Sequence, residues 1–206
     1  MATLSEILTA VNSYVDLEAA EPTGSELTLR TNYANQAVRE WASAYQWPEL
    51  TQVYTTFASG ATISLPSTFR EFLSAPRDIN QNVYIQIAPE ERQKRDVSEM
   101  YMYLTGNAMS GFTATFNQFT GGTLSMTFQR YASGFATLTD ICEVPDPEYV
   151  KMKVASYILQ SRSDDRFPTV EATANTMLRN MIGRRMRPLG GGVNTTPRRE
   201  TYVMGE

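Results

Sequence analysis

The chain begins with apolar positions spaced three to four residues apart, which is the pattern of an amphipathic helix. Thr3 and Glu6 have the spacing of a capping box, so we expect the helix to begin there. Its apolar face carries Leu4, Ile7, Leu8, Val11 and Val15. Residues 21–24 (EPTG) break the pattern. A second helix follows, and two short helices with narrow apolar faces cannot bury those faces against each other alone. We therefore expect both to pack against a third and a fourth helix.

A second helix is predicted over residues 25–46, and Trp47-Pro48 ends it. Its apolar positions at core spacing are Leu27, Ala34, Ala37, Val38, Trp41 and Tyr45. We interpret Trp41 and Trp47 as anchors at the junction between the helices and the predicted sheet.

From Thr51 the period of the apolar residues falls to two, which is typical of half-buried strands. Residues 53–57 and 61–65 flank Ser59-Gly60 and predict a hairpin. Residues 89–99 are charged and are expected to form a short helix or loop. Further strands are predicted over 68–73, 82–87, 100–104, 111–116 and 124–131, with turns at 105–107 and 121–122. Such short strands, rich in threonine and aromatic residues, indicate a small antiparallel sandwich or barrel.

After residues 144–147 (VPDP) the helical period returns and predicts a third helix. A loop at 164–168 separates it from a fourth helix, which Pro168 is suited to open. The core positions of these two helices are Tyr149, Met152, Val154, Ala155, Ile158, Leu159, Val170, Ala174, Met177, Leu178, Met181 and Ile182.

The ends of the chain are therefore helical and its middle is β, which predicts an α+β fold. We expect residues 1–48 and 145–187 to form a four-helix layer, with an antiparallel β-sandwich or barrel module inserted as residues 49–144. Residues 188–206 would form an extended C-terminal arm.

This arm has no helical or strand period, because it contains Gly190–Gly192, two prolines and small polar residues. Fixing a backbone residue costs roughly 1–2 kcal/mol, so about nineteen residues cost on the order of 20 kcal/mol. At ~25 cal/mol per Å², offsetting this cost takes roughly 800 Å² of apolar burial. Since the arm has few large apolar groups, we expect it to lie against other subunits of an assembly; packing on its own domain is the alternative.

The net charge of −4 predicts no general attraction to nucleic acid or membrane, but the charges are unevenly distributed. The first thirty residues carry Glu6, Asp16, Glu18, Glu21 and Glu26 against Arg30 alone. Residues 179–199 contain arginines and no acid: Arg179, Arg184, Arg185, Arg187, Arg198 and Arg199. This asymmetry suits head-to-tail packing, or a basic arm that contacts an acidic or phosphate surface. Complementing the dipole of their own helix explains Arg184 to Arg187 but not Arg198 and Arg199.

No catalytic or metal-binding pattern is present in the sequence. Histidine is absent, and the single cysteine, Cys142, excludes an intrachain disulfide. Asp164-Asp165 and Asp146 with Glu148 lack an EF-hand spacing and are interpreted as caps and turns. We therefore expect no cofactor, no metal and no enzymatic activity. No apolar run approaches the ~20 residues of a membrane span, and no signal-peptide pattern is seen, which predicts a soluble, non-secreted chain.

The order of several segments resembles that of the head–tail adaptor (connector) proteins of tailed bacteriophages, over roughly residues 25–183. The segments are REWASAYQWPEL (39–50), ISLPSTFREFL (63–73), EMYMYLTGN (99–107), LSMTFQRYASGFATLTD (124–140) and PDPEYVKMKVASYILQSRSDDRFPTVEATANTMLRNMI (145–182). Each motif is a core pattern rather than a site signature, so the order of all of them carries the resemblance.

The resemblance implies a structural virion protein, assembled in the host cytoplasm and acting in genome ejection. Such proteins form a homo-oligomeric ring, commonly a dodecamer, docked beneath the portal protein in the neck of the particle. The ring receives the next tail or neck protein, and DNA passes through its channel without sequence-specific binding. The C-terminal segment often reaches the portal, and no membrane is involved.

The residues expected to contact the portal or a neighbouring subunit are Arg184, Arg185, Arg187, Arg198, Arg199 and Tyr202. We also expect the acidic first helix and the basic fourth helix to offer complementary faces. Two other functions stay open: a tail-completion or tail-terminator ring protein, and a DNA-binding packaging accessory protein whose arginine-rich tail binds phosphate.

Overall fold

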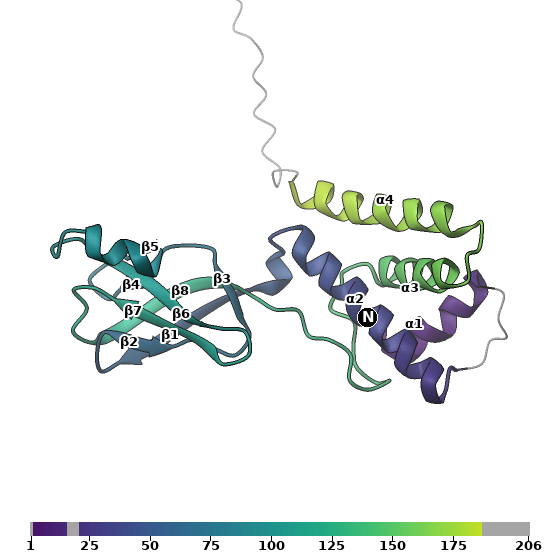
Figure 1. Cartoon of the computed structure of the whole chain (residues 1–206), viewed down its shortest axis with the longest axis horizontal. Coiled ribbons are helices and arrows are strands. Elements are labelled where there is room, and N and C mark those ends of the chain that lie inside the picture. The colour runs from purple at the N-terminus through teal and green to yellow at the C-terminus, as the bar shows by residue number, and fades with distance from the viewer. Residues whose placement is uncertain (1, 16–20, 187–206) are drawn as a thin grey trace, which may run out of the picture.

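A computed structural model describes residues 2–15 and 21–186 of the chain. Within these residues, helices come from both ends of the chain and strands from its middle (Figure 1). The predicted α+β class is therefore confirmed. The predicted arm, residues 188–206, lies outside the described residues.

The helices gather on one side of the molecule, around α3 (Figure 1). They are α1 (Leu4–Val11), α2 (Gly24–Ala44), α3 (Pro147–Ser161) and α4 (Phe167–Met186), with the short 3₁₀ turns η1 (Asn12–Tyr14) and η2 (Pro48–Leu50). A third 3₁₀ turn, η3 (Pro89–Lys94), lies among the strands and contacts β6. The other three α-helices each pack against α3. Apolar side chains on more than one face of α3 are buried, including Val150, Val154 and Leu159, which is why it occupies the centre.

Local sequence signals explain where the helices begin. In α1 the Thr3 hydroxyl accepts from the Glu6 amide, and the Glu6 carboxylate accepts from the Thr3 amide at 2.8 Å, as the capping-box spacing predicted. Asp146 caps α3, and Pro147 follows at its first turn, where a missing N–H costs nothing. The second helix ends at Ala44, two residues earlier than expected, because Tyr45 adopts an extended backbone.

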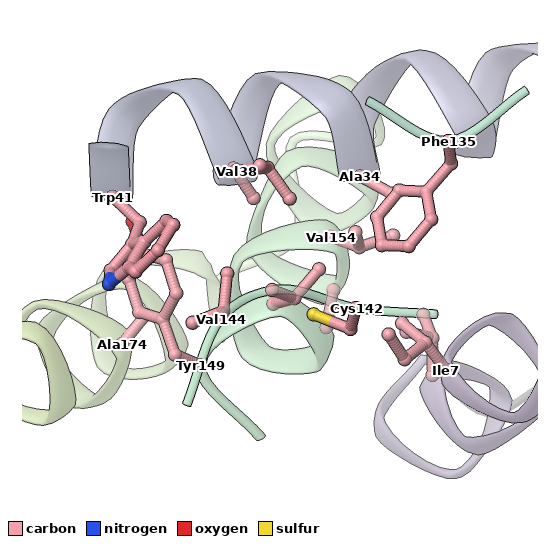
Figure 2. Close-up of a cluster of buried hydrophobic side chains, with 14 of the residues drawn as sticks. Ile7, Ala34, Val38, Trp41, Phe135, Cys142, Val144, Tyr149, Val154 and Ala174 are labelled. Carbon is pink, nitrogen blue, oxygen red and sulfur yellow. The ribbon is translucent and has the colours of Figure 1, made fainter. Parts of the chain in front are cut away.

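A large apolar cluster joins the four helices with the chain segment that precedes α3 (Figure 2). Trp41 and Trp47 are both fully buried in it, with ring centroids 5.0 Å apart. The Trp47 indole N–H donates to the Trp41 carbonyl at 2.6 Å, which fixes the turn between α2 and the first strand. The two tryptophans therefore belong to the helical core.

Two four-stranded sheets form the middle of the chain. The strands are β1 (Thr51–Ala58), β2 (Thr62–Ser64), β3 (Phe69–Phe72), β4 (Arg77–Asp78), β5 (Ile85–Ile87), β6 (Tyr101–Asn107), β7 (Gly111–Phe116) and β8 (Gly122–Arg130). In one sheet β8 lies between β1 on one side and β3 with β4 on the other. The second sheet has the order β2-β7-β6-β5.

The predicted hairpin across Ser59-Gly60 is wrong. The strand before this turn, β1, pairs along its whole length with β8, from Thr51 opposite Gln129 to Ala58 opposite Gly122. The strand after the turn, β2, pairs with β7 in the other sheet. The turn therefore carries the chain from one sheet to the other, which a local turn signal does not distinguish from a hairpin.

Two further details of the β module differ from expectation. The pairing of β5 with β6 is parallel, so the second sheet is not purely antiparallel. Residues 105–107, predicted as a turn, belong to β6, and the turn follows at 108–110. Gly106 has φ +95°, and a Cβ there would lie 2.1 Å from the Gly111 carbonyl oxygen, so the glycine serves close pairing of two strands rather than a turn.

A second apolar cluster, separate from the helical one, lies in the β module. It is rich in aromatic rings that meet edge to face, such as Tyr84 and Phe116 with centroids 5.2 Å apart. Asp78, also buried, accepts hydrogen bonds from the amides of Asn80 and Asn82 and from the Tyr84 hydroxyl. These contacts hold the pKa of Asp78 below its usual value against the opposing effect of burial.

The chain crosses between helices and sheets twice, through η2 and through residues 131–146 (Figure 1). Asn35 of α2 holds the returning segment by accepting from the Phe135 amide and donating to the Phe135 carbonyl. At the N-terminus, Thr3 forms a β-bridge with Ile141. Thr3, just before α1, and Asn35, within α2, therefore both hold the same returning segment.

Candidate assembly interface

Asp146 and Asp164, which the sequence analysis interpreted as cap and turn residues, make local contacts in the structure. Asp146 accepts from the Glu148 amide at the start of α3, and Asp164 binds the Arg166 guanidinium at 2.9 Å. Cys142 is buried, and burial raises the pKa of its thiol to about 11. Within residues 2–15 and 21–186 there is no group of three or more acidic, cysteine or histidine side chains that could hold a metal ion.

The C-terminal end of α4 is the basic surface that the structure describes. Arg184 and Arg185, both predicted as partner contacts, are exposed there. The Arg185 guanidinium pairs with the carboxylate of Glu49, in the turn η2 that leads into β1. Arg184 and the exposed Arg179 form no ion pair with any residue in the described part of the chain. Their positive charges are therefore available to a partner.

A surface hollow of about 280 Å³ lies beside this basic end. Its lining combines the two arginines with apolar side chains and one acid: Trp47, Pro145, Asp146, Met181, Arg184 and Arg185. The other predicted contacts, Arg187, Arg198, Arg199 and Tyr202, lie outside the described residues, so the structure places two of the six.

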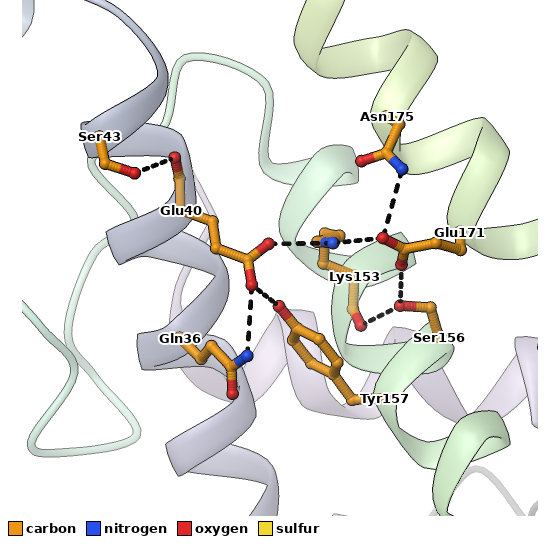
Figure 3. Close-up of polar contacts among 8 residues, drawn as sticks. All are labelled: Gln36, Glu40, Ser43, Lys153, Ser156, Tyr157, Glu171 and Asn175. Carbon is orange, nitrogen blue, oxygen red and sulfur yellow. Dashed lines mark hydrogen bonds and ion pairs between the residues drawn. The ribbon is translucent and has the colours of Figure 1, made fainter.

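A charge network around the buried Lys153 fixes α4 to the rest of the helices (Figure 3). The Lys153 ammonium lies 2.9 Å from the Glu40 carboxylate of α2 and 2.7 Å from the Glu171 carboxylate of α4. Tyr157 donates to Glu40 at 2.5 Å, and Ser156 donates to Glu171 at 2.7 Å. Three helices therefore share one cation, which makes the orientation of α4 specific.

The pKa values in this network follow from its geometry. Burial alone would lower the pKa of Lys153, but its hydrogen bonds to Glu171 and Glu40 outweigh burial and raise that pKa. Burial opposes ionisation of the two glutamates as well, yet their hydrogen bonds with Tyr157, Ser156 and Lys153 lower both carboxyl pKa values. All three charges therefore persist at neutral pH.

The acidic N-terminal end offers fewer unpaired carboxylates than the sequence suggested. Glu6 caps its own helix, and its hydrogen bonds with Thr3 lower the pKa of the Glu6 carboxyl. Glu21 accepts from the Ser5 hydroxyl, and Glu26 pairs with Arg30. Asp16 and Glu18, which would add to this surface, lie outside the described residues.

The model of one protein family, the SU10 adaptor protein, matches residues 2–200 of the chain. The chain belongs to this family. The match confirms the resemblance to phage head–tail adaptors that the order of segments indicated, and it identifies the chain as a phage adaptor and a virion component. A comparison with curated proteins gave no significant match.

The adaptor also exposes large apolar side chains that sequence reasoning did not single out. On β1, Val53 is 67% exposed and Phe57 is 75% exposed. Ile79 and Ile85 are also exposed on the β module, and Met109 protrudes at the tip of the β6–β7 turn. The alternation along β1 predicted a strand correctly, but it did not show which face of that strand meets the second sheet.

None of the helices in the described part of the adaptor is long and apolar enough to cross a membrane.

Proposed function

We propose that the adaptor is a structural protein without catalytic activity that forms a ring, commonly of twelve copies in such proteins, between the portal and the tail. The ring forms part of the DNA channel in the phage neck. The observation that carries this proposal is the family match over residues 2–200, which covers the helices, both sheets and part of the arm. The absence of histidine from the sequence also supports a role in assembly rather than catalysis.

A ring requires two different surfaces on each subunit that fit each other, so that the rotation per step closes. The outer face of α4 supports one such surface, because it is uncharged and carries small side chains that allow close approach. This face carries Pro168, Thr169, Ala172, Thr173, Thr176, Met177 and Asn180. Arg179 and Arg184, which form no ion pair within the described residues, lie on the same helix, and we propose that they meet the acidic end of the next subunit.

Native mass spectrometry of the purified full-length adaptor, alone and with its portal protein, tests the ring directly. The expected result is one closed oligomer of defined mass, present alone or formed on the portal. A chain that stays monomeric under both conditions would contradict the proposal.

The basic arm gives a second test. Replacing Arg198 and Arg199 by glutamate is expected to weaken docking to the portal at least about tenfold, because two attractive contacts become repulsive. The melting temperature of the isolated chain should not change, since these residues are expected to contact a partner. Binding by surface plasmon resonance and thermal unfolding measure the two effects, and deleting residues 188–206 should abolish docking.

Arg92→Glu with Arg95→Glu is the matched control, because it makes the same change in net charge within and directly after the exposed turn η3. It should leave docking within about twofold of the parent, as expected for exposed charges away from the interface. An equal loss in both variants would attribute the effect to net charge. A drop of several degrees in the melting temperature of the arm variant would mean that the arm belongs to the fold of its own subunit.

The exposed Arg179 and Arg184 also support a second candidate, a DNA-binding packaging accessory. Fluorescence anisotropy with duplex DNA distinguishes the two functions. Tight binding that weakens steeply with salt would favour the accessory role. An adaptor through whose channel DNA passes should bind duplex DNA weakly and without sequence preference.

A further inference from the structure

The free edge of β1 lacks the features that usually block pairing with another chain. β1 is eight residues long, and among residues 2–15 and 21–186 it has β8 on one side and no strand on the other. Its sequence, TQVYTTFA, contains no charged residue and no proline. Natural proteins protect sheet edges with short strands, charges, prolines or bulges. An unprotected edge of this length is therefore a place where a further strand can bind.

The other sheet edges in the described part of the chain are protected in these ways. β2 and β5 are three residues long, and β4 is two. β3 is four residues long and carries Arg70 and Glu71. Among the described strands, β1 therefore forms the one sheet edge that lacks such protection.

The outward face of β1 adds apolar surface beside this edge. Val53, Thr55 and Phe57 alternate on the exposed face, whereas Ala58 on the other face is buried. Val53 and Phe57 are 67% and 75% exposed. A strand added at the edge would place its own alternate side chains next to these two.

The arm carries a matching segment near its end. Residues 201–204 (TYVM) are uncharged and rich in the β-branched and aromatic residues that favour strands. We propose that this segment of a neighbouring copy adds as a strand to the free edge of β1. This inference rests on the proposed function in one respect, because the ring is what brings a second copy close enough to contact β1.

The starting point of the arm favours a neighbouring copy over its own sheet. The pair between Arg185 and Glu49 places the end of α4 beside the turn that leads into Thr51, the first residue of β1. The roughly fourteen residues from 187 to 200 span up to about 46 Å when extended, whereas the eight residues of β1 span about 26 Å. An arm that extends away from this turn would therefore carry residues 201–204 past its own β1 and toward a neighbouring copy.

Crosslinking between two variants that each gain one exposed cysteine tests this contact. Full-length Thr55→Cys and Tyr202→Cys are mixed, assembled and treated with a short bismaleimide crosslinker, while native mass spectrometry reports the oligomer. Cys142 stays in place, because it is only 5% exposed. The expected product is a dimer of one chain of each kind. Thr105→Cys mixed with Tyr202→Cys is the matched control, since Thr105 is an exposed strand threonine of the other sheet.

Proline variants of the arm separate strand pairing from proximity. Val203→Pro removes a backbone donor within the proposed strand and should lower the yield at least about tenfold. Asn194→Pro, in the preceding linker, should leave the yield within about twofold.

The proposed contact is refuted if Thr105→Cys gives the same crosslinking yield as Thr55→Cys, or if neither variant forms a crosslink. It is also overturned if a diluted Thr55→Cys/Tyr202→Cys chain crosslinks only within itself, which would assign the arm to its own β1. A closed ring without the Thr55 crosslink would refute this contact and leave the proposed function intact. A chain that does not oligomerise at all would count against both.

Discussion

Replacing Trp41 by alanine is expected to lower the free energy of unfolding by about 3–5 kcal/mol, the usual cost of truncating a buried aromatic side chain. Trp41 is fully buried and stacks on Trp47 at the point where α2 turns toward β1. Its indole nitrogen has no hydrogen-bond partner within the described residues, so no polar contact is lost and the cost comes from the cavity. Urea unfolding followed by circular dichroism measures the change.

Leu29→Ala is the matched control for this variant, because Leu29 lies on the same helix and is 48% exposed. A surface substitution of this kind should change the stability by no more than about 0.5 kcal/mol. Trp41→Phe should fall between the two, since it keeps a ring in the cluster. If Trp41→Ala lowered the free energy of unfolding by no more than Leu29→Ala does, the assignment of Trp41 to the helical core would be wrong.

Replacing Lys153 by methionine is expected to cost about 3 kcal/mol. The change keeps most of the aliphatic side chain but leaves Glu40 and Glu171 facing each other without the cation that both contact. Breaking a buried ion pair costs about 3–5 kcal/mol, and the lower end applies because water still reaches the two carboxylates. Lys151→Met, which removes a paired lysine nearer the surface of the same helix, should cost at most about 1 kcal/mol.

The cost of Lys153→Met should depend on pH. In the parent, the lowered pKa values of Glu40 and Glu171 give stability that is present above about pH 4.5 and is lost as the pH falls through the lowered values. Without the ammonium group most of this contribution is absent. Urea unfolding should therefore show the full difference between parent and variant at pH 7 and a smaller one below about pH 4. An equal difference at both pH values would mean that packing, not charge, explains the loss.

The helices could be read from the sequence because their signals are local. The Thr3 and Glu6 capping box, the apolar face of α1 and the proline at the start of α3 each act within one or two turns. The central place of α3 and the shared contacts of Lys153 were not predicted. They depend on three helices meeting, and a lone lysine among apolar positions does not show whether it points to water or to two glutamates.

Strand positions were predicted better than strand partners. The residues of β1 and β8 alternate clearly, but the pairing of Thr51 with Gln129 joins positions far apart in the chain. Ser59-Gly60 supports a tight turn equally well within a sheet or between two sheets. Pairing is decided by which faces become buried together, and that information is spread over the whole module.

The partner contacts at the end of α4 stay a prediction. The cluster of arginines pointed to the end of α4, where the structure shows Arg184 exposed and Arg185 paired with Glu49. The exposed face of β1 was missed, because alternation alone does not assign a face to solvent. Family membership, in contrast, could be inferred from the order of segments before any fold was known.

The double crossing between helices and sheets has a mechanical consequence. The Asn35 side chain forms hydrogen bonds with both the amide and the carbonyl of Phe135 in the returning segment, and Thr3 forms a β-bridge with Ile141 of the same segment. A force that pulls the sheets away from the helices would therefore act on both crossings at once. The contacts of Asn35 and Thr3 with the returning segment would then have to break together rather than one after another. Such a joint resists sudden tension better than a single connection, which suits the role proposed above between the portal and the tail.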